Sequence, residues 1–326
     1  MLLTLAGLLF IAVLILLANA ATESGISHGF LRILPAAMPA VVALQLLGRV
    51  SNSGTTNFIQ CLYLGFAAAS IAIMLLLIRF DAPWPYVKRL ISGSGLVAAP
   101  TFDSRRPIHR LAFLLLIFGF SLLFWTASAE GLQQDLLNAY SSAESALDDT
   151  SMMAAAYVLL ALWGVGWLVR RDWASACKRL GLRFPTTVDV LIGCALGCAL
   201  YLGVSLMTMV WQSMAPASDF QWQTAAARQL FASMSSSLLL GALVALLAAI
   251  GEETLFRGAL QPVFGVPITS LFFTAIHLQY VATPAMAIVF VVSLAFGLAR
   301  AWLSTTAAII AHVIYNLIPF LLANLA

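Results

Sequence analysis

Charge is scarce in this sequence. Of its 326 residues only 9% are Asp, Glu, Lys or Arg, whereas 62% are hydrophobic. In a typical soluble domain about a quarter of all residues are charged, so this composition excludes an ordinary soluble protein. Apolar stretches of roughly 20 residues, the length that a helix needs to cross a hydrocarbon core, recur along the chain. The sequence therefore predicts an integral membrane protein surrounded by a lipid bilayer.

Other features are missing as well. The apolar runs are long and continuous, whereas a transmembrane barrel would show short alternating segments, so we expect an all-α polytopic bundle. Lys and Arg form short clusters beside apolar runs, as in cytoplasmic loops, and no basic surface for nucleic acid is indicated. The four cysteines are too few for a disulfide framework, and no CxxC spacing occurs.

Nine apolar windows predict about nine membrane helices. They cover residues 2–20, 59–78, 111–127, 152–169, 190–211, 237–256, 267–282, 285–302 and 306–323. We expect the first window to be a retained helix and not a cleaved signal peptide, because it is long and lacks a positive leading segment. Residues 30–48 are also apolar, but Pro35 and Pro39 interrupt them, which favours a re-entrant or interfacial segment.

The charged residues predict an orientation. Lys and Arg concentrate in residues 79–110 and again in residues 170–183, whereas residues 128–150 carry acids without a single Lys or Arg. Cytoplasmic loops are enriched in Lys and Arg, so both basic loops should face the cytoplasm. The same alternation places the C-terminal end of the helix at residues 237–256 at the cytoplasmic face.

We expect a boundary near Pro185. Residues 1–185 form an N-terminal multi-spanning region of unknown role, and residues 186–326 form a block of closely spaced helices. Ionisable side chains inside membrane helices are costly and are functional candidates. Those of the C-terminal block, with one amide, are Glu252, Glu253, Arg257, His277, Arg300, His312 and Asn316. Arg300 lies near a helix end, where its side chain is expected to reach the interface.

Spacing separates the two adjacent glutamates. Glu253 and Arg257 are four residues apart, so on a helix they share a face and form an ion pair. Glu252 points about 100° away around the helix and meets Phe256, not a cation, one turn later. The single free carboxylate therefore suits a general base or acid.

The histidines supply partners for this carboxylate. His312 and Asn316 are four apart and project from one helix face. His277 ends another apolar run, with Phe273 one turn earlier to shape or seal a pocket. For any single one of these residues, a salt-bridge patch or a hydrogen bond between helices is as good an explanation as a functional site. The whole set, concentrated between Glu252 and Asn316, instead favours one functional site.

A glutamate with two histidines fits hydrolysis by an activated water. HExxH and GxSxG motifs are absent, which argues against a zincin or a serine hydrolase of the elbow type. In one version, Glu252 and His277 polarise a water directly. In the other, Glu252, His277 and His312 bind a divalent metal such as zinc. In both versions His312 and Asn316 would donate to the developing oxyanion.

Three motifs carry a family resemblance. They read EETLFR from Glu252, FTAIH from Phe273 and HVIYN from His312, in this order in successive helices. The ordered set resembles the CAAX prenyl protease and bacteriocin-processing family, or CPBP, also described as glutamate-dependent intramembrane proteases. The resemblance covers roughly residues 186–323, and no known pattern matches the first 180 or so residues.

The resemblance implies an intramembrane endopeptidase whose active site opens to the cytosol. It implies that Glu252 is the base, that His277 helps to activate water, and that His312 and Asn316 form the oxyanion site. Glu253 and Arg257 correspond to the structural pair of the family. Related members cleave prenylated proteins, bacteriocins or signalling peptides, so the substrate is expected to be a membrane-associated, prenylated or propeptide-type polypeptide. A bacterial inner membrane is compatible with this plan.

Two alternatives stand beside the protease. A non-catalytic scaffold or bacteriocin-immunity protein would keep the helical block to bind a membrane partner, although it has no need for the Glu, His, His and Asn set. A transporter would use the buried acids as a proton relay. We find no paired broken helices in matching halves to support a transporter.

Overall fold

The computed structural model describes residues 2–24, 58–128, 143–235, 237–280 and 283–325, together with residues 40, 43 and 138. Across these residues the secondary structure is helical, apart from one isolated bridge between Trp167 and Arg171. The predicted all-α bundle is confirmed. Apart from residues 40 and 43, the re-entrant segment expected at residues 30–48 lies outside the described residues, as do the acids Glu130 and Asp135.

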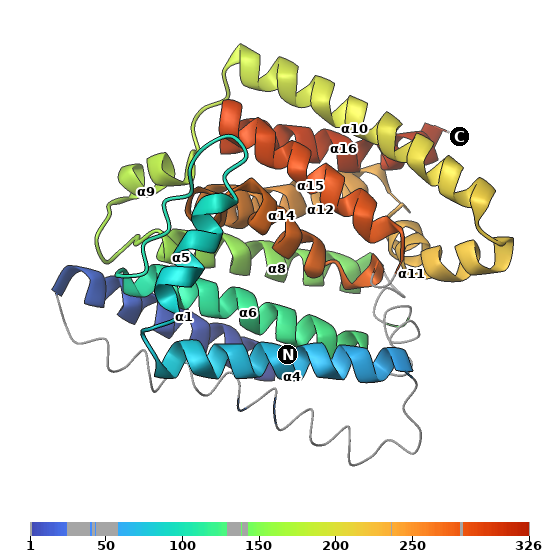
Figure 1. The fold of residues 1–326 in the computed structure, drawn as a ribbon. Coiled ribbons are helices and arrows are strands. Elements are labelled where there is room, and N and C mark those ends of the chain that lie inside the picture. Colours follow the sequence, from blue (N-terminus) through green and yellow to red (C-terminus); the bar gives the residue numbers. More distant parts are fainter. Residues whose placement is uncertain are drawn as a thin grey trace.

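The helices form a layered bundle (Figure 1). The N-terminal half contains α1 (Leu2–Ser24), α4 (Phe58–Arg79), α5 (Trp84–Gly93), α6 (Pro107–Ala127), α8 (Ala143–Gly164) and α9 (Trp173–Leu180). The C-terminal half contains α10 (Thr187–Met214), α11 (Ala217–Met234), α12 (Leu238–Glu253), η2 (Thr254–Leu260), α13 (Gln261–Phe264), α14 (Val266–Ala275), η3 (Leu278–Tyr280), α15 (Ala285–Trp302) and α16 (Thr305–Leu325). In Figure 1, α8 and α12 lie between the α1, α4 and α6 layer and the α10 and α16 layer.

Six described helices are long and apolar enough to cross a membrane, so the count of nine is not confirmed. The window at residues 152–169 is interrupted because α8 ends at Gly164, after which Gly166 and Leu168 adopt positive φ. The helix in the window at residues 267–282 is also shorter than predicted, because α14 ends at Ala275.

The helix that carries both glutamates does not end near residue 256. It passes from α12 through the π-helical segment η2 into α13 and stops only at Gly265, which has a φ of 81°. Arg257 does not end the helix because its charge is paired within it. Glu252 therefore lies near the middle of a helix that runs from Leu238 to Phe264, and not at the C-terminal end of that helix.

Both basic loops lie at one end of the bundle, as the charge pattern predicts. In the first loop, the Thr101 amide donates to the carbonyl of Pro262, at 2.9 Å. Beside the second loop, Arg179 Nη1 donates to the carbonyl of Gly258, at 3.2 Å. We call this end, where α5 and α9 appear at the left of Figure 1, the basic end.

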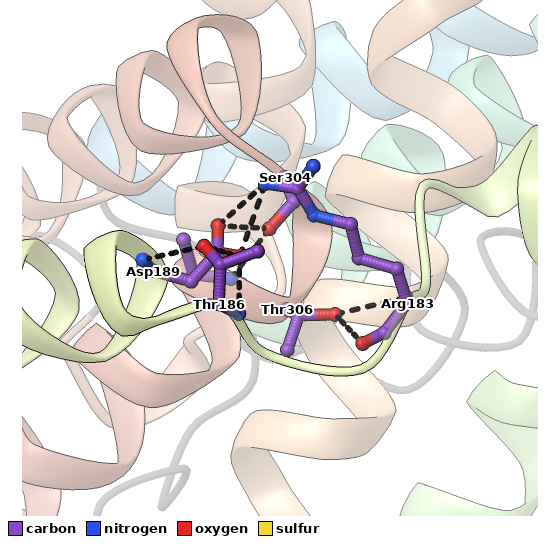
Figure 2. Close-up of polar contacts among 6 residues, drawn as sticks. Arg183, Thr186, Asp189, Ser304 and Thr306 are labelled. Carbon is purple, nitrogen blue, oxygen red and sulfur yellow. Dashed lines mark hydrogen bonds and ion pairs between the residues drawn. The ribbon is translucent and has the colours of Figure 1, made fainter.

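Close packing and a buried carboxylate fix the histidine helix α16 to α10. A Cβ on Gly197 would lie 2.6 Å from the carbonyl oxygen of Ala311, so only glycine permits this approach. Figure 2 shows Asp189, fully buried at the start of α10, accepting hydrogen bonds from Thr186 Oγ1 at 2.7 Å and Ser304 Oγ at 2.8 Å. These contacts tie the first turn of α10 to the turn from which α16 begins.

Candidate active site

A cavity of about 710 Å³ lies between α8 and the helices of the C-terminal half. Its lining includes all five residues that the motifs predicted to face a pocket, which are Glu252, Phe273, His277, His312 and Asn316. Glu253 and Arg257 are absent from the lining. The structure thus gathers the candidate catalytic groups from three segments and leaves the ion pair behind the cavity wall.

The predicted ion pair is formed and is completely buried. Glu253 Oε2 lies 3.1 Å from Arg257 Nε, and neither side chain is exposed. Arg257 also donates from Nη2 to Ser293 Oγ at 3.0 Å, and its guanidinium lies 4.8 Å from the centre of the Phe273 ring. The π-helical geometry that begins at Thr254 therefore still brings residues four apart into contact.

Glu253 has a second partner that the spacing did not predict. Its Oε1 lies 3.0 Å from Nδ1 of His312, whose ring stacks on Phe296 with a centroid distance of 4.7 Å. Because the carboxylate beside Arg257 accepts, Nδ1 of His312 carries the proton. The other ring nitrogen, Nε2, is then the atom available to the cavity.

Glu252 is the carboxylate without a protein partner. It is half-buried, and among the described residues its buried Oε2 finds no hydrogen-bond donor. Glu253 thus has two side-chain partners, whereas no hydrogen bond to the Glu252 carboxylate is found in the described part of the chain. A water or a substrate group can therefore serve as the partner of this oxygen.

His277 lies just beyond a helix and not within one. Its Nδ1 is 2.7 Å from the carbonyl oxygen of Phe273, and its backbone amide donates to Thr274 at 3.1 Å. The imidazole therefore caps the last turn of α14, which explains why the helix stops short of the predicted residue 282. Since a carbonyl only accepts, Nδ1 carries the proton and Nε2 can accept a hydrogen bond from water.

Sequence reasoning missed several groups at this site. Tyr157, on α8 of the N-terminal region, lines the cavity, packs edge-on against Phe256 and lies within electrostatic reach of Glu252. No motif marks this tyrosine. Ser293, the acceptor for Arg257, had a signal: it is small and lies four residues before Gly297, a spacing typical of close helix contacts.

The predicted metal ligands do not form a ligand set. Among the described residues, no three His, Cys, Asp or Glu side chains are grouped so that they could hold a metal ion. The Nδ1 atoms of His277 and His312 already bind a carbonyl and a carboxylate, and the histidines and Glu252 do not converge on one point. The zinc version of the site is therefore unsupported by the geometry of these residues.

Comparison with known proteins agrees with the motifs. Residues 234–318 match the family model described as type II CAAX prenyl endopeptidase, Rce1-like. This confirms the resemblance to the CAAX protease family over about a quarter of the chain, within the predicted C-terminal block. No curated protein and no solved structure matches the chain.

Removing Arg257 should destabilise the protein strongly. Arg257→Met leaves Glu253 buried beside His312 without its permanent cation, and breaking a buried pair in this way costs about 3–5 kcal/mol. Thermal unfolding of the purified protein in detergent measures the effect. Arg228→Met, which removes an exposed arginine of α11, is the control and should change little.

A double variant separates charge from packing. Glu253→Gln with Arg257→Met leaves no isolated charge, so part of the lost stability should return. Equal stability of Arg257→Met and the unaltered protein would contradict the buried ion pair.

Proposed function

We propose that this chain, whose C-terminal block matches the type II CAAX prenyl endopeptidase family, is an intramembrane endopeptidase that uses Glu252 to activate water. One observation carries the proposal: a carboxylate that finds no partner among the described residues shares a cavity with two imidazoles and an amide. Each of these groups has a task in peptide hydrolysis, whereas a scaffold needs none of them.

The reaction follows from the free atoms at the cavity wall. A water donates hydrogen bonds to Glu252 and to Nε2 of His277, and Glu252 takes its proton as the water oxygen attacks the peptide carbonyl carbon. The tetrahedral oxyanion accepts from the side-chain amide of Asn316. Glu252 then returns the proton to the leaving amine as the C–N bond breaks, which restores the site.

His312 lies one helical turn before Asn316, and both residues line the cavity. Its Nδ1 is 3.0 Å from Glu253 Oε1, and this contact fixes the orientation of the ring. We propose that the other ring nitrogen, Nε2, faces the substrate.

The cavity lining favours a particular substrate within the family's range. Among the described lining residues, Asp149 and Glu252 are acidic and none is Lys or Arg, while most of the wall is apolar. An apolar peptide segment fits such a wall, but a terminal carboxylate near the scissile bond would find no cation. We therefore propose cleavage within a membrane-associated or propeptide-type substrate, in preference to release of a short C-terminal tripeptide.

We propose a bacterial inner membrane with the basic end in the cytosol. The cavity extends from Glu252 toward the opposite end, where α8 and α12 begin, and its exposed lining residues are Asp149 and Met153. These exposed side chains favour access from the face opposite the basic end. Such access differs from the cytosolic opening that the family resemblance implies.

Cysteine labelling tests this orientation. Asp149→Cys and Ala174→Cys, each in a chain whose four native cysteines are replaced by serine, place one thiol at each end of the bundle. A membrane-impermeant maleimide added to intact cells should label position 149, and should label position 174 on α9 only after permeabilisation. The reverse pattern would place the basic end outside and the cavity toward the cytosol.

Glu252→Gln tests the proposed chemistry. The amide keeps the shape of the side chain but cannot take a proton, so the cleavage rate should fall by a factor of about 10² to 10⁴. Activity is measured on a peptide library with purified protein, and unchanged thermal unfolding shows that the variant is folded. The exposed Asp219→Asn on α11 is the matched control and should retain activity. Full cleavage by Glu252→Gln would refute the assignment of Glu252 as the base.

A further inference from the structure

Arginines gather at the basic end, apart from the cavity. Arg171 precedes α9, Arg179 lies on it and Arg300 is in the last turn of α15, and all three are partly buried. Arg106 and Arg170 are further electrostatic neighbours of Arg179. Residues far apart in the chain therefore place several positive charges together.

The hydrogen bonds of these arginines reach neutral groups. Arg171 Nη1 donates to the carbonyl of Val165, and Arg179 Nη1 donates to the carbonyl of Gly258 at 3.2 Å. Arg300 packs so closely on Gly181 that a Cβ there would lie 2.7 Å from its guanidinium. Its Nε is buried and has no hydrogen-bond partner among the described residues.

Nearby carboxylates are engaged elsewhere. The Asp172 carboxylate caps α9 by accepting a hydrogen bond from the backbone amide of Ser175, with 2.8 Å between Oδ1 and N. Asp189 accepts from Arg183, Thr186 and Ser304 in the network that Figure 2 shows. Within the described part of the chain, no ion pair joins a carboxylate to Arg171, Arg179 or Arg300.

The positive charge persists at neutral pH. Burial, together with Arg171, Arg300 and the other neighbouring arginines, lowers the pKa of Arg179 to about 10, so the group remains protonated. Partly buried cations without a counter-charge are costly, and an anion bound among them would remove that cost. Guanidinium groups match phosphate oxygens in paired hydrogen bonds.

The surroundings point to a lipid. Leu168, Val169 and Trp173 are exposed immediately beside Arg171, with exposed fractions of 69%, 36% and 57%. Tryptophan is enriched where membrane meets water, and basic pockets at the cytoplasmic ends of membrane helices bind anionic headgroups. A phospholipid would place its phosphate on the arginines and its acyl chains on this apolar surface.

We propose that Arg171, Arg179 and Arg300 form a binding site for the phosphate of an anionic phospholipid. Through Arg179 the site touches Gly258, which follows Arg257 in η2. A lipid headgroup bound here would therefore lie directly behind the helix segment that holds the buried ion pair.

Lipid binding to the purified full chain tests this site without any measurement of cleavage, so the result is independent of the proposed protease activity. Native mass spectrometry and thermal unfolding compare phosphatidylglycerol, phosphatidylcholine and inorganic phosphate as probes. Phosphatidylglycerol should bind saturably and phosphatidylcholine should not. Arg179→Gln and Arg300→Gln should each weaken phosphatidylglycerol binding by roughly tenfold, the effect of one charged hydrogen bond.

Controls make the outcome decisive. Arg179→Lys keeps a positive charge, so its affinity for phosphatidylglycerol should lie between those of the unaltered protein and Arg179→Gln. If Arg179→Gln does not fold, Arg179→Lys is the folded variant for the comparison. Lys88 and Arg89 are exposed on α5 at the same end. A variant that carries both Lys88→Gln and Arg89→Gln should change lipid binding by less than about twofold, as expected for surface charges. Inorganic phosphate that binds as tightly as the lipid would support the arginine site but identify a free anion as its ligand. Equal binding of both lipids, or an equal loss in the α5 pair, would overturn the proposal.

Discussion

The Glu253 carboxylate is the interaction on which the candidate site depends. One oxygen meets Arg257 at 3.1 Å and the other meets His312 at 3.0 Å, with no exposure of the carboxylate to solvent. A buried carboxylate is tolerated only where such partners satisfy it. By holding the histidine of α16 against the glutamate helix, this one group sets the distance between the two walls of the cavity. Among the described residues, Glu252 by contrast has neither an ion pair nor a hydrogen bond to its carboxylate.

Local spacing predicted part of this arrangement. The four-residue separation of Glu253 and Arg257 was enough to assign the pair, and it was enough to single out Glu252. The contact between Glu253 and His312 could not be predicted, because it joins residues 59 positions apart and depends on how α12 and α16 pack. Helix ends were also missed: the imidazole of His277 ends α14, and paired Arg257 lets its helix continue to Phe264.

The N-terminal region takes part in the candidate site although its sequence shows no family motif. α8 packs against α12 so closely that a Cβ on Gly251 would lie 2.7 Å from the backbone of Ala154. From this helix Asp149 and Tyr157 enter the cavity lining. The family match begins only at residue 234, so this wall is supplied by a part of the chain outside it. Contacts with a substrate at this wall would therefore differ from those made by the segment that matches the family model.

The central claim is that side chains alone activate the water at Glu252. Metal analysis of the purified protein, combined with peptide cleavage before and after chelation, tests it most directly. The account predicts that protein freed of bound metal cleaves at the same rate as untreated protein, because Glu252, His277 and His312 do not form a ligand set. Cleavage that is lost on chelation and restored by zinc would contradict the account.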